Sequence, residues 1–218
     1  MTTPHGGVRE QVAAACRGLS ASGLVKGTAG NVSVRVDGGI AITATGLVFA
    51  EATVDDVVIV DDKGKVVVGA LAPSSELGLH AAAYQEDAVR SVVHTHAPGS
   101  IAVSLVSDRL PCIHYQQLAL GGEVAVIPYF LFGSPELAEH ASATLSEANA
   151  VILAHHGAVT TGGTLDEAIG NTSLLEWACD IYLRARSIDT PSELSSEQQA
   201  EVIMSVVATG YGTKRRAE

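Results

Sequence analysis

Cysteine and aromatic residues are scarce in this sequence. Cys16, Cys112 and Cys179 are odd in number and far apart, so they can form neither paired CxxC metal motifs nor a disulfide framework. Reduced and mostly buried thiols are therefore expected, as in a cytoplasmic protein. Aromatic residues make up only 4% of the chain, so Ala, Val and Leu must supply most of the core.

Basic charge and long apolar runs are lacking as well. The formal net charge of −11 argues against a nucleic-acid partner, because binding a phosphate backbone needs a basic face. The one dense basic run, KRRAE, closes the chain and is expected to be a solvated tail. No apolar run approaches the ~20 residues of a membrane helix, and MTTPHGGVRE lacks the features of a secretory signal. The sequence therefore predicts a soluble, cytoplasmic protein without a membrane partner.

The apolar residues that are present follow helix and strand periods. Val8, Val12, Cys16 and Leu19 recur at steps of three and four, which predicts an amphipathic helix over 8–19. The further predictions, in chain order, are hairpins over 31–45 and 54–69, a helix from about Ser74, a strand over 90–96, a helix over 97–106, an ambiguous region over 111–128, a strand over 124–129, a helix over 134–148, two strands within 149–162, and helices from 165 to about 187 and from 195 to about 208. This order predicts a single domain, residues 1–218, with an α/β sandwich around a mixed or antiparallel sheet.

Two histidines end the apolar strand predicted over 90–96. Side chains two apart in a strand share a face, so His94 and His96 should point the same way, as two ligands of one metal ion would. The pair alone is weak evidence, and surface or hydrogen-bonded histidines remain an alternative. A second buried strand ends in His155 and His156, only one of which can face the same ion. Two strands thus offer three convergent imidazoles, the set that a catalytic zinc takes while keeping one position open.

Glu76 and several glycine and serine turns complete the candidate residues. Glu76 lies in the first turn of the helix predicted from Ser74, where it either adds a carboxylate to the metal site or merely complements the helix dipole. Glycines before a strand, and hydroxyls at a helix start, let backbone N–H groups approach an anion. The residues in such turns are Gly27, Gly30, Asn31, Thr45, Gly46, Ser74 and Ser75. Singly each is a common turn or cap, but together they suit a small phosphorylated ligand held by neutral donors.

The motifs GTAGNVSVR, ITATG, PSSELGLHAAAYQ, VVHTHAP, IHYQQLALGG and HHG occur in this order along nearly the whole chain. In this respect the sequence resembles the class II aldolase/adducin family, most closely its L-fuculose-1-phosphate aldolase branch. The resemblance implies a three-layer sandwich with helices on both faces of the sheet. It also implies a homotetramer with active sites at subunit boundaries, and reversible cleavage of a ketose 1-phosphate to dihydroxyacetone phosphate and an aldehyde such as L-lactaldehyde.

The resemblance also implies a role for each matching position. One Zn²⁺ per subunit would be held by His94, His96 and His156, with Glu76 as a ligand in the resting state and as the base during turnover. The substrate phosphate would be held by Gly30, Asn31, Thr45, Gly46, Ser74 and Ser75. Tyr115 matches a proton donor that reaches the neighbouring subunit's site, and Tyr211 more loosely matches a tyrosine on a mobile C-terminal segment, here from about residue 209. Imidazole and carboxylate ligands also accept Mn²⁺ or Co²⁺.

Other functions remain open within and outside the family. The family usually reads Asn-His-Gly where this chain reads His155-His156-Gly157, so the role of His155 is undetermined. Pentulose-phosphate 4-epimerases resemble the chain but typically carry aspartate at Glu76, whereas dehydratases and decarboxylases can keep the glutamate. Adducin-like scaffolds have the fold without the chemistry and would be expected to have lost the metal ligands, whereas all four candidate ligands are present here. A cupin barrel would place the glutamate after the HxH motif, and here it comes before.

Overall fold

The structure is a computed structural model, which describes residues 6–211. Its strands are β1 (Gly30–Val36), β2 (Gly39–Thr43), β3 (Val57–Val60), β4 (Val66–Val68), β5 (Ser91–Thr95), β6 (Arg109–Leu110), β7 (Val124–Ile127), β8 (Ala150–Leu153) and β9 (Gly157–Gly162). Its α-helices are α1 (Gly6–Ala21), α2 (Leu77–Ala83), α3 (Pro98–Ser104), α4 (Pro135–Leu145), α5 (Leu165–Arg186) and α6 (Ser196–Thr209). Short 3₁₀ helices are η1 (Phe49–Glu51), η2 (Val54–Asp56) and η3 (Tyr115–Leu120).

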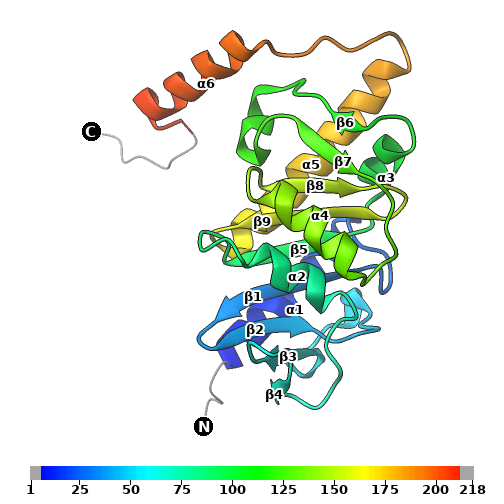
Figure 1. Cartoon of the computed structure of the whole chain (residues 1–218), viewed down its shortest axis with the longest axis vertical. Helices are drawn as coiled ribbons and strands as arrows, with labels where there is room; N and C mark the ends of the chain where they lie inside the picture. Colours follow the sequence, from blue (N-terminus) through cyan, green and yellow to red (C-terminus); the bar gives the residue numbers. More distant parts are fainter. Residues whose placement is uncertain (1–5, 212–218) are drawn as a thin grey trace.

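The strands of the described residues form one sheet in the order β4-β3-β2-β1-β5-β9-β8-β7-β6. Neighbouring strands are antiparallel except β7 and β8, which are parallel. Helices α2 and α4 pack together on one face, and α1, α3 and α5 lie on the other (Figure 1). The predicted mixed α/β sandwich with helices on both faces is therefore confirmed.

Alternating side chains of β5 pack into the hydrophobic cores on the two faces of the sheet. Val93 packs with Val12, Cys16 and Leu19 of α1 on one face, while Val92 packs with Leu79 of α2 and residues of α4 on the other. His94 and His96 continue the row of Val92, since residues two apart share a face. The strand therefore carries both imidazoles toward the layer of α2 and α4.

The start of α2 differs from the prediction. Pro73 forms a bridge with Ala44, and the N–H of Ser74 donates to the carbonyl of Thr43, so the chain is tied to the end of β2 at this point. One turn follows, and the helix begins only at Leu77. Glu76 is consequently the residue before the helix rather than part of its first turn.

The other predicted helices and strands are confirmed, with shifts of a few residues at their ends. Within the ambiguous region, residues 115–120 form η3, which the His114 side chain caps by accepting from the N–H of Gln116. Helix α6 lies apart from the sheet and contacts η3 (Figure 1). Of the C-terminal segment from about 209, residues 212–218 lie outside the described residues, so its mobility stays a prediction.

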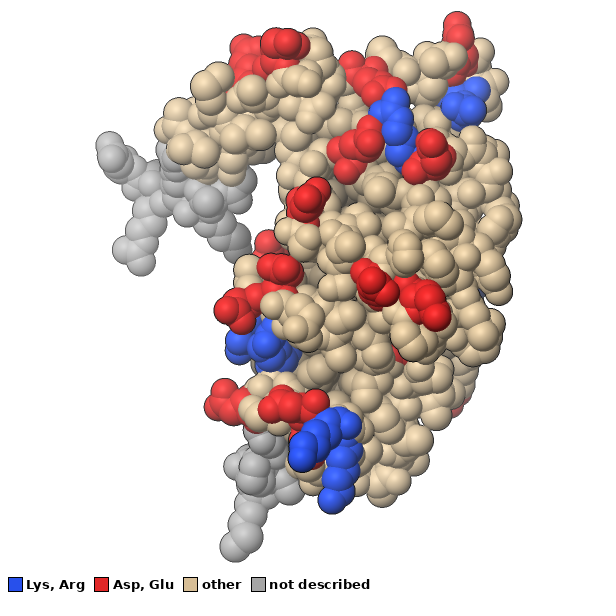
Figure 2. All heavy atoms as spheres, viewed as in Figure 1, with Lys and Arg blue, Asp and Glu red and all other residues tan. Residues whose placement is uncertain are grey.

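The surface shows no large basic region on the face in view. Figure 2 shows Lys and Arg side chains there in separate small groups beside Asp and Glu. Among the described helices, none is both long and apolar enough to span a lipid bilayer.

Candidate metal centre and adjoining cavity

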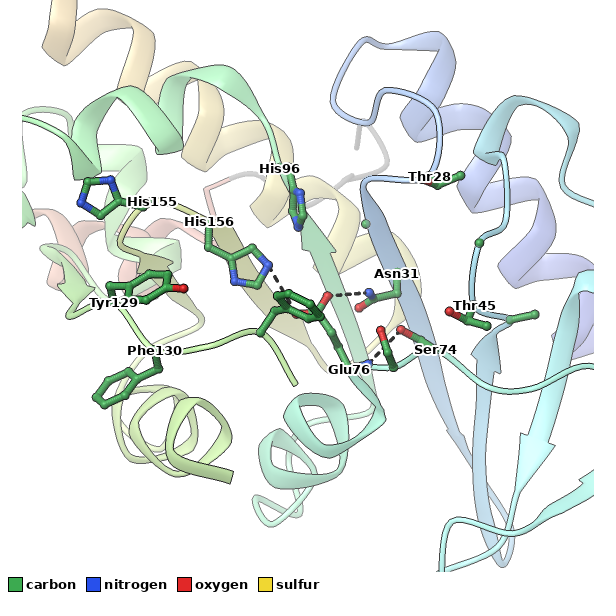
Figure 3. A pocket seen from close by; sticks show the side chains of 15 residues that line it. Thr28, Asn31, Thr45, Ser74, Glu76, His96, Tyr129, Phe130, His155 and His156 are labelled. Atoms are coloured by element: carbon green, nitrogen blue, oxygen red, sulfur yellow. Dashed lines mark hydrogen bonds and ion pairs between the residues drawn. The ribbon is translucent and has the colours of Figure 1, made fainter. Parts of the chain in front are cut away.

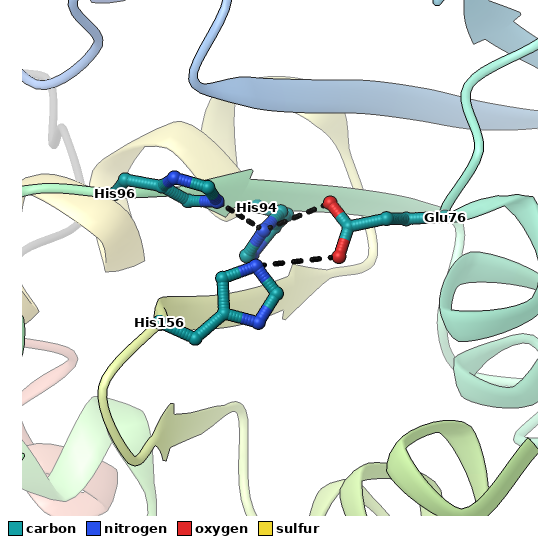
Figure 4. Close-up of side chains that lie close together, drawn as sticks. All are labelled: Glu76, His94, His96 and His156. Atoms are coloured by element: carbon teal, nitrogen blue, oxygen red, sulfur yellow. Dashed lines mark hydrogen bonds and ion pairs between the residues drawn. The ribbon is translucent and has the colours of Figure 1, made fainter. Parts of the chain in front are cut away.

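Four side chains from three parts of the fold converge at one point (Figure 4). Glu76 precedes α2, His94 lies in β5 with His96 just after it, and His156 lies in the turn between β8 and β9. One nitrogen or carboxylate oxygen from each lies within 4.8 Å of those of the others. Nε2 of His94 is 3.0 Å from Nε2 of His96 and 3.1 Å from Oε2 of Glu76, and Nε2 of His156 is 3.3 Å from Oε1 of Glu76.

His94 is held in one orientation by the neighbouring strand. Its ring is fully buried, and Nδ1 lies 2.9 Å from the carbonyl oxygen of Ala158 in β9. A carbonyl can only accept, so Nδ1 carries the proton and the lone pair of Nε2 faces the cluster. This backbone partner is the kind that orients histidine ligands in metal sites.

Two glycines allow the strands to come together at the cluster. A Cβ on Gly157 would lie 2.1 Å from the carbonyl oxygen of Thr95, and a Cβ on Gly30 would lie 2.6 Å from that of His94. Such contacts are far shorter than van der Waals separation, so any larger residue would push β9 or β1 away from β5. The glycines therefore set the spacing on which the positions of His94 and His156 depend.

The cluster is electrostatically suited to a cation. Burial, together with the nearby His94, lowers the pKa of His96 and of His156 to about 4, so both rings are neutral near pH 7. Burial favours the neutral carboxyl of Glu76, but the adjacent His94 and the hydrogen bond from Asn31 outweigh it and hold the pKa of Glu76 well below the usual range. At neutral pH the neutral rings of His96 and His156 therefore lie beside an ionised carboxylate.

The residues fit a divalent metal ion. Oε1 of Glu76 is buried and accepts no hydrogen bond from any described residue, although buried polar groups normally find a partner. Three imidazole nitrogens converge beside it, and imidazole with carboxylate is a donor set that zinc and other divalent transition metals accept. An ion placed among these atoms would satisfy the oxygen and the facing nitrogen lone pairs together.

A cavity of about 390 Å³ opens beside the cluster (Figure 3). Glu76, His96 and His156 line its middle. Every residue predicted for the phosphate lines it too: Gly30, Asn31, Thr45, Gly46, Ser74 and Ser75. Thr28, which the sequence interpretation did not include, lies on the same side as Thr45 and Ser74 (Figure 3).

The polar side of the cavity offers neutral donors. Among the described residues that line it, none is Lys or Arg. The backbone N–H groups of Gly46 and Ser75 donate to no other described residue, and both residues are exposed. Free N–H groups next to hydroxyls form the kind of concave site that binds phosphate. Ser74 and Ser75 lie in the turn before α2, so the prediction that they form the start of a helix is wrong.

The opposite side of the cavity is aromatic. Tyr129, Phe130 and His155 lie there (Figure 3), and Phe132 also lines the cavity. None of the three aromatic residues Tyr129, Phe130 and Phe132 was assigned a role from the sequence. His155 has a φ of 59°, which separates its ring from that of His156 and places it 6.4 Å from the Tyr129 ring. His155 thus borders the cavity without joining the four-residue cluster. A sequence clue to this wall was available in the apolar run after β7.

The two predicted tyrosines lie together but outside this cavity. The hydroxyls of Tyr115 and Tyr211 are 2.9 Å apart, and this hydrogen bond raises the pKa of Tyr115 above its ordinary value. Both residues line a different, apolar pocket between η3 and α6. Within one chain, therefore, they are not brought to Glu76.

The model of the class II aldolase and adducin N-terminal domain matches residues 10–183 of the chain. The chain belongs to this family. Its match covers the sheet, both helical layers and the four-residue cluster. Because members are lyases, the prediction of an aldolase-type enzyme is confirmed at the level of the family.

Two curated members of the class II aldolase family are similar to the chain over nearly their full length. One is a 5-methylthioribulose-1-phosphate/5-deoxyribulose-1-phosphate aldolase of Escherichia coli O45:K1, 36% identical over 207 residues, which are 94% of this chain and 96% of the relative. The other is the L-fuculose phosphate aldolase of Escherichia coli K12, 37% identical over 207 residues, 94% of this chain and 95% of the relative.

Solved class II aldolase structures have the same fold. An L-fuculose 1-phosphate aldolase superposes with a TM-score of 0.88 at 30% sequence identity, covering 92% of this chain and 96% of that structure. The resemblance inferred from the sequence motifs is thereby confirmed. Relatives with two different substrates match about equally well, so the comparisons leave the sugar open.

Proposed function

We propose that the chain is a zinc-dependent aldolase that cleaves a ketose 1-phosphate, with L-fuculose 1-phosphate as the first candidate. The products would be dihydroxyacetone phosphate and an aldehyde such as L-lactaldehyde. One observation carries the proposal: a single cavity joins the Glu76–His94–His96–His156 cluster to a phosphate-sized group of unpaired neutral donors.

Each part of the cavity has a task in this reaction. The donors around Gly46 and Ser75 hold the phosphate on C1, so that C2 and C3 come to lie near Glu76. When bound to the three imidazoles, Zn²⁺ supplies Lewis-acid stabilisation for negative charge on the substrate oxygens. Neutral imidazoles suit that task because they leave the positive charge of the ion undiminished.

Glu76 is the proposed base. Cleavage breaks the C3–C4 bond and leaves its electron pair on C3, delocalised toward the C2 oxygen. The proton of the C4 hydroxyl departs as the aldehyde forms, and C3 takes up a proton to give dihydroxyacetone phosphate. A carboxylate with a strongly lowered pKa is ionised at neutral pH. In condensation it can remove the proton from C3 of dihydroxyacetone phosphate, and in cleavage it can return to C3 a proton taken up from solvent.

The proton at the aldehyde oxygen requires a further group. Tyr115, supplied by a neighbouring subunit, is the proposed group: it donates this proton to the aldehyde oxygen in condensation and passes the C4 hydroxyl proton on to solvent in cleavage. Tyr211 is a second candidate through its hydrogen bond to Tyr115. This proposal goes with a homotetramer whose active sites lie at subunit boundaries. It is supported by the position of both tyrosines on the outside of the chain that carries them.

The aromatic wall favours a substrate with an apolar end. Tyr129 and Phe130 lie on the side of the cavity opposite Thr45 and Ser74 (Figure 3), where the end of the sugar remote from C1 would lie. Phe132 also lines the cavity. A terminal methyl group, as in L-fuculose 1-phosphate, would pack there. The same wall would also accept 5-deoxyribulose 1-phosphate, which the name of one relative specifies, and this sugar is the second candidate substrate.

A retro-aldol assay tests the proposal. Zinc-loaded protein is given each of the two sugar phosphates, and dihydroxyacetone phosphate is followed by coupled reduction. Release that stops after chelation and in Glu76→Gln supports the proposal, and the ratio of kcat/KM values identifies the preferred sugar. Metal-bearing protein that releases nothing from either sugar would point to epimerase, dehydratase or decarboxylase chemistry. Protein that binds no metal would point to an adducin-like scaffold.

A further inference from the structure

A continuous chain of hydrogen bonds leads away from Glu76 into the interior. Nδ2 of Asn31 lies 3.0 Å from Oε2 of Glu76, and Oδ1 of the same amide contacts Nε2 of His80. Nδ1 of His80 lies 2.6 Å from Oγ of Ser33, which is 2.8 Å from the hydroxyl of Tyr84. All five side chains are buried, and His80 and Ser33 are fully so.

This chain of hydrogen bonds depends on two matched residue spacings. Glu76 just before α2, His80 within it and Tyr84 just after it recur every four residues, and Asn31 and Ser33 are two apart on β1. Four residues of a helix rise ~6 Å and two residues of a strand ~6.6 Å, so the two rows stay in step. The polar side chains alternate between helix and strand along one line beneath the cluster.

The direction of every bond follows from what each group can do. The carboxylate of Glu76 only accepts, so Asn31 must present its NH₂ group to it and turn its carbonyl oxygen to His80. That oxygen also only accepts, so Nε2 of His80 carries the proton. A neutral imidazole then leaves Nδ1 as an acceptor, which takes the proton of Ser33, and Ser33 in turn accepts from Tyr84. All the donors therefore point toward Glu76.

We propose that His80 is a positioning residue, which fixes the Asn31 amide and through it the carboxylate of Glu76. This inference rests on the proposed function of Glu76 as the base. Without the Nε2–H donor, the Asn31 amide is free to rotate its oxygen toward Glu76, where it would repel the carboxylate. The hydrogen bond that orients Oε2 would then be lost while the cavity lining stays in place.

The kinetic test compares variants of neighbouring positions in α2. His80→Leu removes the donor at similar volume and is expected to lower kcat about 10- to 100-fold, the usual range for partners of metal-site residues. His80→Gln, whose amide can still donate to Asn31, is expected to recover part of the loss. Leu79→Ala is the matched control, because the Leu79 side chain is apolar and buried in the core and the substitution leaves the backbone in place. It should lower thermal stability but not kcat.

A second measurement on metal-free protein is independent of activity. With ¹⁵N-labelled histidine rings, His80 is expected to show the Nε2–H tautomer, and the side-chain NH₂ of Asn31 should exchange slowly with water in wild type but not in His80→Leu. An Nδ1–H tautomer would overturn the proposal, as would unchanged kcat in His80→Leu or equal losses of kcat in Leu79→Ala. If the wild type releases no dihydroxyacetone phosphate, the proposed function has failed and the tautomer and exchange data alone decide the role of His80.

Discussion

The carboxylate of Glu76 lies 3.1 Å from the ring of His94, although one residue precedes a helix and the other ends the row of core residues in β5. Oε2 of Glu76 is engaged by His94 and Asn31, while Oε1 is buried without a hydrogen bond. A buried oxygen without a hydrogen bond destabilises the folded protein by about 1–3 kcal/mol unless a ligand binds it. The cluster is therefore best explained as a site built around a cation.

Glu76→Gln tests the base directly. The amide keeps the size of the side chain but cannot take up a proton, so kcat for ketose 1-phosphate cleavage should fall about 10²- to 10⁴-fold. Steady-state kinetics of zinc-loaded protein measure this, with metal content determined on the same sample. A variant that holds zinc and keeps wild-type kcat would remove Glu76 from the mechanism.

Substituting single histidines distinguishes metal ligands from residues that only lie near the cluster. His96→Ala takes one imidazole from the cluster and should weaken zinc binding by at least ~100-fold, more than the loss of an outer partner costs. His155→Ala should leave the affinity close to wild type, because its ring lies toward Tyr129 and outside the cluster. Competition with a chelating dye measures both. Equal losses in the two variants would mean that the ligand set has been assigned wrongly.

Acid should destabilise the metal-free protein. Burial lowers the pKa of His80 from its ordinary 6.5 to about 3. Between these values the unfolded chain binds a proton that the folded chain does not, so the free energy of unfolding falls as the pH drops below about 6.5. The loss from this one group is about 1.4 kcal/mol per pH unit.

Urea unfolding over a pH series measures that slope. His80→Gln has no proton to bind at this position, and its unfolding free energy should therefore depend less steeply on pH, by about the same amount. Parallel slopes in the two proteins would show that His80 is protonated in the folded state, contrary to its environment.

Gly157→Ala should disrupt the pairing of β5 with β9. The added methyl group would lie 2.1 Å from the carbonyl oxygen of Thr95, and forcing it in should cost about 1–3 kcal/mol of stability. Gly170→Ala in α5 is the matched control, since nothing lies within 4 Å of its Cβ position, and it should be neutral or stabilising by up to about 1 kcal/mol. Thermal unfolding distinguishes the two, and a Gly157→Ala protein as stable as the control would contradict the close approach.

Patterns local in sequence predicted most of the fold. Apolar residues recur at steps of three and four in α1 and at steps of two in β1 and β2, and these patterns depend on which face of each element is buried. Both patterns can be recognised without knowing which distant residues pack against them. The HxH spacing of His94 and His96 likewise placed both rings on one face. The resemblance to the family then supplied Glu76 and the choice of His156 over His155.

Features that depend on distant partners were not predictable in this way. Ser74 looked like a helix start, but the bridge between Pro73 and Ala44 delays the helix to Leu77. His80 lies within a predicted helix, where the sequence alone indicates no role for it, and its proposed role depends on Asn31 and Ser33, which lie opposite it on β1. The aromatic side of the cavity at Tyr129 had only the apolar run after β7 as a clue, and that run does not indicate which cavity its side chains line.

In the proposed mechanism, cleavage requires one metal ion in the Glu76–His94–His96–His156 cluster. The most direct measurement is a titration of Zn²⁺ into chelated protein with L-fuculose 1-phosphate and 5-deoxyribulose 1-phosphate, recording the release of dihydroxyacetone phosphate at each addition. We expect no release without metal, and a linear rise that ends at one equivalent per chain. Full activity in the metal-free protein, unchanged by added zinc, would contradict the proposed mechanism.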